Sequence, residues 1–410
     1  MKKVRIVFLV FLLMINCFTI FVYATENSVP AEETVTTENT GNTAELIEKD
    51  GTVTNTYGRI IETKAVTEVL TGTVTDKVQE VVVEITEGDY IGEEFTTNYI
   101  LSYDIEGKIL AHELEVGDKV SVQITEDADG QVSTTVLDVA RAGYLVTLFI
   151  LFLVVIIIIG GKKGIRAILG LLLTILLIYF VMIKGIFNGK DVIKTSILAI
   201  GLVIIGTFII IGEGINKKIL TAALGTLGGV LSAGIVASIF NNMAKMTGAG
   251  EDAIQLSINM TTVNFNFREL LFAGILVAAL GACMDVGMSI ASSLDEIKIK
   301  NPEITWQELL KSGMNIGRDV IGTMTNTLIL AYVGGSLTLI LLFMACNMSL
   351  IEIANKETIA QEVISAISGS MGVVFTVPIT SVIYALLNKD KTVYSKVSQN
   401  KINGKRSLKI

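Results

Sequence analysis

The distribution of apolar residues divides the chain into two regions of different character. Between residues 143 and 388, apolar runs of about 18 residues or more alternate with short polar connections. Runs of this length can cross the hydrocarbon core of a membrane as helices. The pattern predicts an α-helical multi-pass membrane protein with about seven transmembrane helices, at residues 143–160, 165–183, 192–212, 219–240, 268–293, 319–345 and 368–388.

Residues 51–142 show a second pattern, in which short runs alternate apolar and polar positions. Such alternation is typical of strands that bury one face. Turn sequences such as Glu87-Gly88-Asp89 separate the runs. The pattern predicts a small closed β-barrel of OB or similar type. The expected strands are 59–62, 66–74, 79–86, 96–103, 119–125 and 133–139.

The remaining segments contribute no core. Residues 1–24 place basic residues before an apolar run, which predicts a secretory signal peptide, with an uncleaved first helix as the alternative. Residues 25–50 are rich in Thr, Glu and Asn and predict a disordered tether. Residues 389–410 form a basic tail.

Charge follows the same division. The chain is 51% hydrophobic and has a net charge of −8. Residues 26–141 hold 25 acidic and 7 basic residues, a net −18, whereas residues 143–410 hold 15 acidic and 22 basic residues, a net +7. The acidic barrel would repel nucleic acid. Basic connections alternate with less basic ones, so the positive-inside rule predicts an extracytoplasmic N-terminal domain and a cytoplasmic tail.

Metal and disulfide chemistry find little support in the sequence. Of the three cysteines, none lies in the predicted barrel, so no disulfide framework is expected there. The single histidine, His112, excludes a cluster of histidine ligands. Residues 127–130 read Asp-Ala-Asp-Gly, which indicates a hairpin turn more than a calcium loop, because the further acidic ligands are missing. We expect no metal site and no cofactor.

Polar residues interrupt two predicted spans at helical spacing. Asp285, Ser289 and Ser292 form one stripe on the fifth helix. The sixth carries a second stripe, with Arg318 beside it. The two stripes are predicted to meet in the inner half of the membrane, through an Asp285–Arg318 ion pair or through hydrogen bonds from Asp285 to Thr323 and Asn326. Two interpretations stay open, a polar clasp that holds the bundle and a site for an ion, proton or polar solute. The stripe on the sixth helix consists of Asn315, Asp319, Thr323 and Asn326.

Three other features concern packing. Small residues on the fourth helix predict close helix contacts. Pro378 should kink the last span, with hydroxyl groups nearby to satisfy freed carbonyls. Residues 347–365 are amphipathic and should lie on the outer membrane surface or form a short soluble helix. The small residues on the fourth helix are Gly225, Gly228, Gly229, Ser232 and Gly234.

The segments GACMDVGMSIASS, at 281–293, and SGMNIGRDVIGTMTNTLILAY, at 312–332, resemble the hallmark segments of the YibE/YibF-like family of multi-pass bacterial membrane proteins. The resemblance extends from about residue 51 to residue 387. It implies a multi-pass protein of the bacterial plasma membrane with this architecture. It implies no activity, because the family is essentially uncharacterised.

Two classes of function fit these observations. A permease or channel for an ion or small polar solute would use the polar site between the fifth and sixth helices. A non-transporting scaffold or sensor would bind a cell-envelope partner through its outer β domain. An enzyme is not expected, because the chain has no Walker motif and no membrane histidine to activate a serine.

Overall fold

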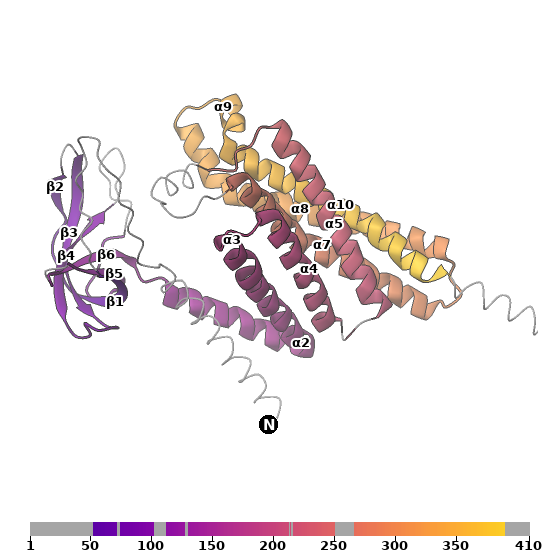
Figure 1. The fold of residues 1–410 in the computed structure, drawn as a ribbon, viewed down its shortest axis with the longest axis horizontal. Helices are drawn as coiled ribbons and strands as arrows, with labels where there is room; N and C mark the ends of the chain where they lie inside the picture. The colour runs from indigo at the N-terminus through magenta and orange to yellow at the C-terminus, as the bar shows by residue number, and fades with distance from the viewer. Residues whose placement is uncertain are drawn as a thin grey trace, which may run out of the picture. The chain divides into compact units, whose positions relative to one another are not determined.

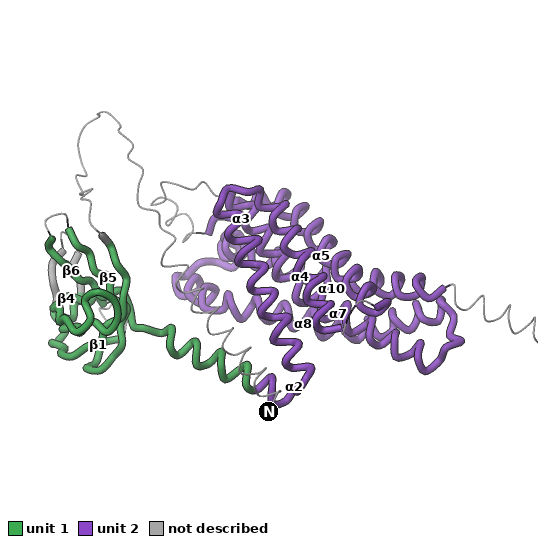
Figure 2. The backbone as a smooth tube through the Cα atoms, turned by 60° about the horizontal axis from the view of Figure 1, so that its bottom comes forward, with its two compact units in different colours: residues 1–154 green, residues 155–410 purple. Residues whose placement is uncertain are grey.

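The computed structural model describes residues 52–389, except 72–73, 102–111, 128–129, 213, 215 and 251–265 (Figure 1). The expected signal peptide, the tether and the tail beyond Lys389 lie outside the described residues. The chain forms two compact units, residues 1–154 and residues 155–410, which are coloured separately in Figure 2. Each unit is described by itself below.

The first unit contains a small, nearly closed β-barrel, as the alternating pattern predicted. Strand β1 pairs with β3 and β5, β3 pairs with β2 and β4, and β5 pairs with β6, all antiparallel. The Thr97 hydroxyl of β4 donates to the Thr134 carbonyl of β6 over 2.5 Å, which joins the two outer strands. The strands are β1 Thr52–Thr63, β2 Thr67–Thr71, β3 Val74–Ile85, β4 Glu94–Leu101, β5 Lys119–Glu126 and β6 Val132–Val139.

The barrel core is built from alternate positions. In β5, Val120, Val122 and Ile124 are buried, whereas the residues between them are partly exposed. The buried Gln79 side chain is bonded at both its nitrogen and its oxygen: the amide donates to the Leu114 carbonyl and accepts from the Leu114 N–H, both over 2.8 Å. A buried amide with both partners costs little, so this pair fixes the segment before β5 against β3.

The acidic turn at residues 127–130 connects β5 and β6. Ala128 and Asp129 lie outside the described residues. On either side of them, the Asp127 N–H donates to the Gln131 carbonyl over 2.9 Å, and the Gly130 N–H donates to the Asp127 carbonyl over 2.8 Å. Gly130 has a φ of 74°, which glycine adopts without strain. These bonds are those of the expected hairpin turn.

We predict that residues 51–141 fold alone and that Gly58 is essential to their packing. A Cβ atom at Gly58 would lie 2.3 Å from Val83 Cγ1 and 3.2 Å from the Glu84 carbonyl oxygen. Gly58→Ala should therefore lower the free energy of unfolding by about 1–3 kcal/mol. Urea unfolding of the fragment, followed by circular dichroism, measures this. Val53→Ala, at an exposed strand position, is the control and should change the value by less than about 0.5 kcal/mol. A spectrum of mostly coil for the unaltered fragment would contradict the prediction.

The second unit is helical, and α2 begins in the first unit and continues into it. Within the described residues, six segments are long and apolar enough to cross a membrane: α2 through α3, α4, α5, α7, α8 and α10. The helices are α2 Ala142–Leu177, the π-helical turn η1 Ile178–Ile183, α3 Lys184–Phe187, α4 Val192–Ile211, α5 Lys217–Met243, α7 Phe267–Lys300, α8 Trp306–Ala345, α9 Leu350–Asn355 and α10 Glu357–Leu387.

The first of these segments, Ala142–Phe187, joins two of the seven expected spans, 143–160 and 165–183, into one continuous apolar segment. Ala142–Phe187 contains 46 residues, about 69 Å of straight helix, which exceeds the thickness of a bilayer. The segment is not straight, because Gly161 has non-helical angles of φ 53° and ψ −127°. A Cβ atom at Gly164 would lie 2.3 Å from the carbonyl oxygen of Ile156, eight residues earlier. In a straight helix these positions would be about 12 Å apart, so the chain turns back on itself at Gly161.

Helix α10 is the centre of the helical bundle. It packs against α5, α7 and α8, and α5 also packs against α7. These long helices lie beside one another in Figure 1. Helix α4 packs on α5 and α7 at the other side of the bundle. Because α8 contacts mainly α10 and α7, it lies at the edge of the bundle.

The small residues of α5 serve close packing, as the sequence predicted. A Cβ atom at Gly225 would lie 2.0 Å from Thr380 Oγ1, and one at Gly229 would lie 1.8 Å from Thr376 Oγ1 and 2.8 Å from the Gly372 carbonyl oxygen. The two backbones approach so closely that no side chain fits between them. Gly228 and Gly234 make similar contacts with Ile379 and Leu276, and the Ser232 hydroxyl donates to the Gly228 carbonyl.

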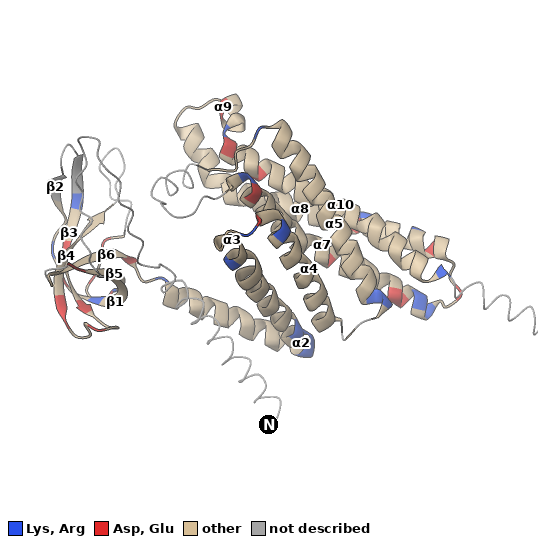
Figure 3. Cartoon of the chain, viewed as in Figure 1, with Lys and Arg blue, Asp and Glu red and all other residues tan. Residues whose placement is uncertain are grey.

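One end of the bundle collects basic connections (Figure 3). Lys217 Nζ, at the start of α5, donates to the Leu387 carbonyl at the end of α10 over 2.5 Å. Lys389 Nζ lies 5.5 Å from the centre of the Trp306 ring at the start of α8. The α4–α5 connection, the α7–α8 connection and the end of α10 therefore share this end. At the opposite end, Glu357 accepts from the N–H groups of Thr247 and Gly248 over 2.7 and 2.8 Å.

Several helix boundaries differ from the prediction. Helix α8 begins at Trp306 rather than 319, because Thr305 and Glu308 form a capping box that starts the helix in its charged segment. Helix α10 begins at Glu357 rather than 368, so the amphipathic segment divides between α9 and the start of α10. Helix α10 continues through Pro378 to Leu387. The kink that we expect at Pro378 stays a prediction.

The α5–α10 contact gives a matched pair of variants. Gly229→Ala would place a methyl group against Thr376 and the backbone of α10, whereas nothing lies within 4 Å of a Cβ atom at Gly201 in α4. Alanine improves intrinsic helix stability by about 1 kcal/mol at both positions, so only the contact distinguishes them. We predict that Gly229→Ala lowers the melting temperature of the purified protein and that Gly201→Ala leaves or raises it. Equal melting temperatures would refute the close contact.

Candidate functional site

The polar stripe of α7 faces outward from the helical unit. Asp285 and Ser289 are exposed and Ser292 is half-buried. The opposite side of the helix carries Cys283, Val286 and further buried residues, which pack toward α5 and α10. The sequence correctly placed the three polar residues on one face. At Asp285 this face is exposed among the described residues.

The stripe of α8 also faces outward. Its buried positions include Gly313 and Gly317, whose Cβ positions lie 2.5 Å from Ser381 Oγ and 2.0 Å from Val377 Cγ1 of α10. Only about 6% of the apolar window of α8 is buried, against 44–50% for α4, α5, α7 and α10. The exposed residues of the stripe are Asn315, Arg318, Asp319, Thr323 and Asn326.

The two stripes lie at the same height along the α7–α8 hairpin. Asp285 precedes Asn301, the C-cap of α7, by 16 residues. On α8, the middle of the stripe is at Ile321, between Asp319 and Thr323, and it follows the N-cap Thr305 by 16 residues. Both positions are therefore about 24 Å from the connection. We call these eight residues the polar band: Asp285, Ser289 and Ser292 of α7, and Asn315, Arg318, Asp319, Thr323 and Asn326 of α8.

The polar band is not an internal clasp. Arg318 Nη1 lies 3.5 Å from Asn315 Oδ1 on its own helix, at the limit of a hydrogen bond. The Thr323 hydroxyl donates to the Val320 carbonyl over 3.1 Å. Among the described residues, no hydrogen bond or ion pair joins Asp285 to Arg318. The expected bond between the two stripes is therefore not formed within the described part of the chain.

This arrangement has an energetic consequence. An ionised Asp or Arg side chain at the centre of a membrane helix costs about 2.5–3.5 kcal/mol on insertion scales unless a partner or water satisfies it. Helices α7 and α8 are both apolar enough to span a membrane. Wherever these charged groups lie within the hydrocarbon, they therefore need either water or another protein surface beside them. Within the described residues, no group of three His, Cys, Asp or Glu side chains is arranged to hold a metal ion.

A second set of polar groups lies inside the bundle, between α5 and α10. Thr226, Thr376 and Thr380 are fully buried. Thr376 donates to the Gly372 carbonyl over 2.8 Å and Thr226 to the Cys283 carbonyl over 3.3 Å, whereas Thr380 Oγ1 has no partner among the described residues. The sequence analysis assigned hydroxyls near Pro378 to the freed carbonyls and did not place them against α5. For Thr376 the available signal was its position four residues after Gly372, because a threonine hydroxyl in a helix can bond the carbonyl four residues earlier.

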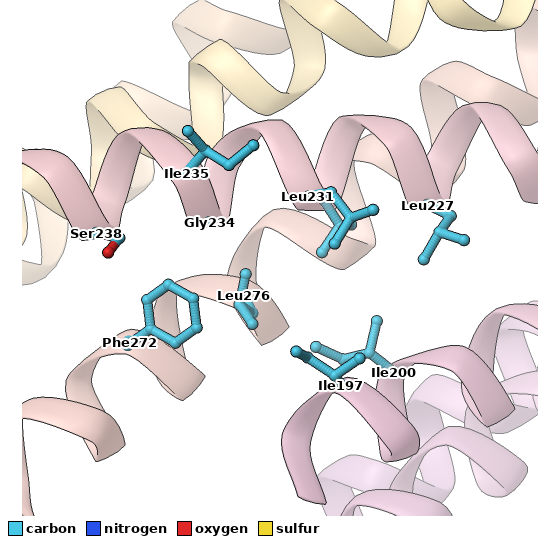
Figure 4. Close-up of a pocket in the computed structure, with 10 residues that line it drawn as sticks. Ile197, Ile200, Leu227, Leu231, Gly234, Ile235, Ser238, Phe272 and Leu276 are labelled. Carbon is cyan, nitrogen blue, oxygen red and sulfur yellow. The ribbon is translucent and has the colours of Figure 1, made fainter. Parts of the chain in front are cut away.

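The described cavities do not include the polar band. One, of about 200 Å³, lies among α4, α5 and α7. Apart from Ser238, the residues labelled in Figure 4 present carbon atoms to it. A second, of about 250 Å³, lies between α8 and α10 and includes Tyr332 and Glu362 in an otherwise mainly apolar lining. Apolar grooves of this kind on membrane helices can be filled by lipid chains.

The comparisons with known proteins give a family but no activity. A family model described as YibE/F-like protein matches residues 148–390, which is more than half of the chain. The matched range covers the helical bundle and excludes the β-barrel, so the resemblance is narrower than the sequence analysis expected. No curated protein and no solved structure matches the chain. The helical bundle, with its hallmark segments on α7 and α8, thus carries the match, and the chain belongs to the YibE/F-like family.

Proposed function

We propose that the protein is a permease or channel for an ion or small polar solute, and that the polar band of α7 and α8 lines its path. The observation that supports this is the outward-facing set of charged and hydroxyl groups on two helices that can span a membrane. A water-filled path beside these helices would hydrate Asp285 and Asp319. No catalytic role is proposed.

The charges of the polar band favour a cation. Asp285 and Asp319 are two carboxylates against the single guanidinium of Arg318. Carboxylate oxygens can replace part of the hydration shell of a cation, and rings of carboxylates give cation selectivity in other pores. The serine and threonine hydroxyls would add neutral oxygen atoms along the path. Arg318 would limit how strongly the path holds a cation and thereby allow its release.

The proposed arrangement in the membrane has seven crossings. The turn at Gly161 would separate two crossings, at about 143–160 and 165–183, on either side of Lys162 and Lys163. The basic end of the bundle would then face the cytoplasm of a bacterial cell, because basic connections remain inside. With an odd number of crossings, the β domain would lie outside the plasma membrane and the tail inside.

Cysteine labelling of intact cells tests this arrangement. Single cysteines at Gln131, Lys163 and Asn400 are introduced after Cys17, Cys283 and Cys346 are replaced. We predict that an impermeant maleimide labels only the cysteine at 131, and that all three react after the cells are opened. Labelling at 163 in intact cells would contradict the seven crossings, and labelling at 400 would contradict the orientation.

A scaffold or sensor is the second candidate function. It is favoured by the autonomous core of the barrel and by exposed apolar side chains on its surface. Ile91, Ile100 and Val116 are 63–64% exposed. A cell-envelope partner could bind there while the helices anchor the domain. Binding of such a partner by a protein that moves no solute would support this candidate.

Ion flux in liposomes tests the transport proposal. We predict that the purified protein conducts a cation across the bilayer and that Asp285→Asn reduces the flux about tenfold, equivalent to about 1.4 kcal/mol. The Asp285 side chain makes no hydrogen bond or ion pair with the described residues of its own chain, so the variant should still elute as a single folded species. Glu303→Gln, an equal change of charge in the α7–α8 connection, is the control and should keep the flux. A wild-type protein that moves none of the common monovalent or divalent cations would refute the proposal.

A further inference from the structure

The exposed side of α7 is built for close helix contact, although none of the helices described in its unit fills it. Gly274, Ala278 and Gly281 precede Asp285 on the same exposed face. Nothing in the structure lies within 4 Å of a Cβ atom at Gly274 or Gly281. The glycines of α5 are explained by contacts with α10, but these two have no such partner. Small residues on a membrane helix allow another backbone to approach closely.

Helix α8 shows the same feature beside its charged residues. Nothing lies within 4 Å of a Cβ atom at Gly322, which lies between Asp319 and Thr323. Glycine weakens a helix interior compared with alanine, so an exposed glycine here has no intramolecular benefit. An open face therefore continues from the polar band along both helices.

The charges on this face suit a second copy of the same chain. In a two-fold contact the same surface meets itself, so an acidic group of one copy can face a basic group of the other. Asp285 and Asp319 supply the acidic groups and Arg318 the basic group. The remaining polar residues of the band can exchange hydrogen bonds across the contact.

The first arm of α2 would not serve as well as a second copy. The first arm of α2, residues 142–160, carries only Tyr144 and Thr147 as polar side chains among long apolar ones. It could cover the small residues of α7, but it offers no charge to Asp285 or Arg318. The hydrocarbon of a membrane offers neither a partner nor water.

We propose that two copies of the chain associate in the membrane through the polar band and the small residues beside it. The contact pairs Asp285 and Asp319 of one copy with Arg318 of the other, and Gly274, Gly281 and Gly322 allow the helices to approach. The proposal goes beyond transport, because a scaffold would need the same shielding of its charges. In a transporter, the two facing bands would enclose the path.

Cross-linking in membranes tests the contact. Cys17→Ser, Cys283→Ala and Cys346→Ser provide the background, and single cysteines replace Ser289 or Thr323. We expect oxidation to give a covalent dimer at one or both positions. The matched controls are Leu198→Cys and Leu386→Cys, which are 58% and 52% exposed on α4 and α10 and should give none. Dimers at the control positions but not at the band would overturn the proposal.

Subunit counting in liposomes gives a readout that needs no cysteine. Fluorescently labelled protein, diluted in lipid, should form dimers, and Arg318→Leu should weaken dimerisation at least about tenfold while the protein elutes as a single folded species. Lys300→Leu removes a cation outside the band and should leave dimerisation unchanged. Monomers of the unaltered protein at every dilution would overturn the proposal. A variant with cysteines at both Leu148 and Thr323 gives a second way to overturn the proposal. If these two cysteines form a disulfide within one chain, α2 covers the polar band and a second copy cannot.

Transport and association can fail separately. Monomers that conduct a cation would refute the association and keep the proposed function. Dimers that conduct nothing would keep the association and refute the proposed function.

Discussion

Hydrocarbon cannot solvate a charge, and this constraint determines how the helical unit is arranged. The interior of the bundle is already occupied by close backbone contacts, in which Gly225 and Gly229 of α5 leave no room for a side chain opposite Thr380 and Thr376. Apart from the amides of Asn241 and Asn388, the buried polar side chains of the described helices are hydroxyls, many of which bond to a carbonyl of their own helix. Among the charged groups of α7 and α8, Asp295 accepts a hydrogen bond from the buried Tyr384 hydroxyl of α10 over 2.9 Å, whereas Asp285, Arg318 and Asp319 face outward.

The position of α8 follows from the same packing. Gly313 and Gly317 bring its first half against Ser381 and Val377 of α10. This contact uses one side of α8 and leaves the opposite side, with Arg318 and Asp319, at the edge of the unit. A path for an ion or a contact with another copy would both make use of that edge. The barrel depends on none of this, because its described core is formed by its own strands and by Leu114 in the segment before β5.

The sequence predicted where the strands and helices lie better than it predicted their boundaries and the neighbours that they contact. The predicted runs overlap all six strands, although β1 begins at Thr52, seven residues before the predicted run. Apolar runs overlap every long helix, since both patterns report which side of an element is buried. The turn at Gly161 was expected as a gap between two helices, but a single glycine conformation makes it. The start of α8 was placed 13 residues late, at 319 rather than Trp306, because the capping box lies in a charged segment that hydropathy excludes.

For the candidate site, too, the sequence predicted which residues share a helix face but not what that face contacts. Helical spacing correctly grouped Asp285 with Ser289, and Asp319 with Thr323, because residues three or four apart share a face. Spacing gives no information on which neighbour that face meets, so the sequence predicted that the two stripes would meet each other. The glycines of α5 could be read from the sequence alone, whereas the open space around Gly281 and Gly322 required coordinates.

The central claim is that the polar band faces water or protein and not lipid. To test it, a spin label is attached at Thr323 in one variant and at Leu198 in another, and each variant is reconstituted in a bilayer. The collision rate of each label is then measured with oxygen, which concentrates in lipid, and with a nickel complex, which stays in water. The account predicts low oxygen collision at Thr323, from contact with protein or water, and high oxygen collision at Leu198. High oxygen collision at both positions, with no access for the nickel complex, would contradict it.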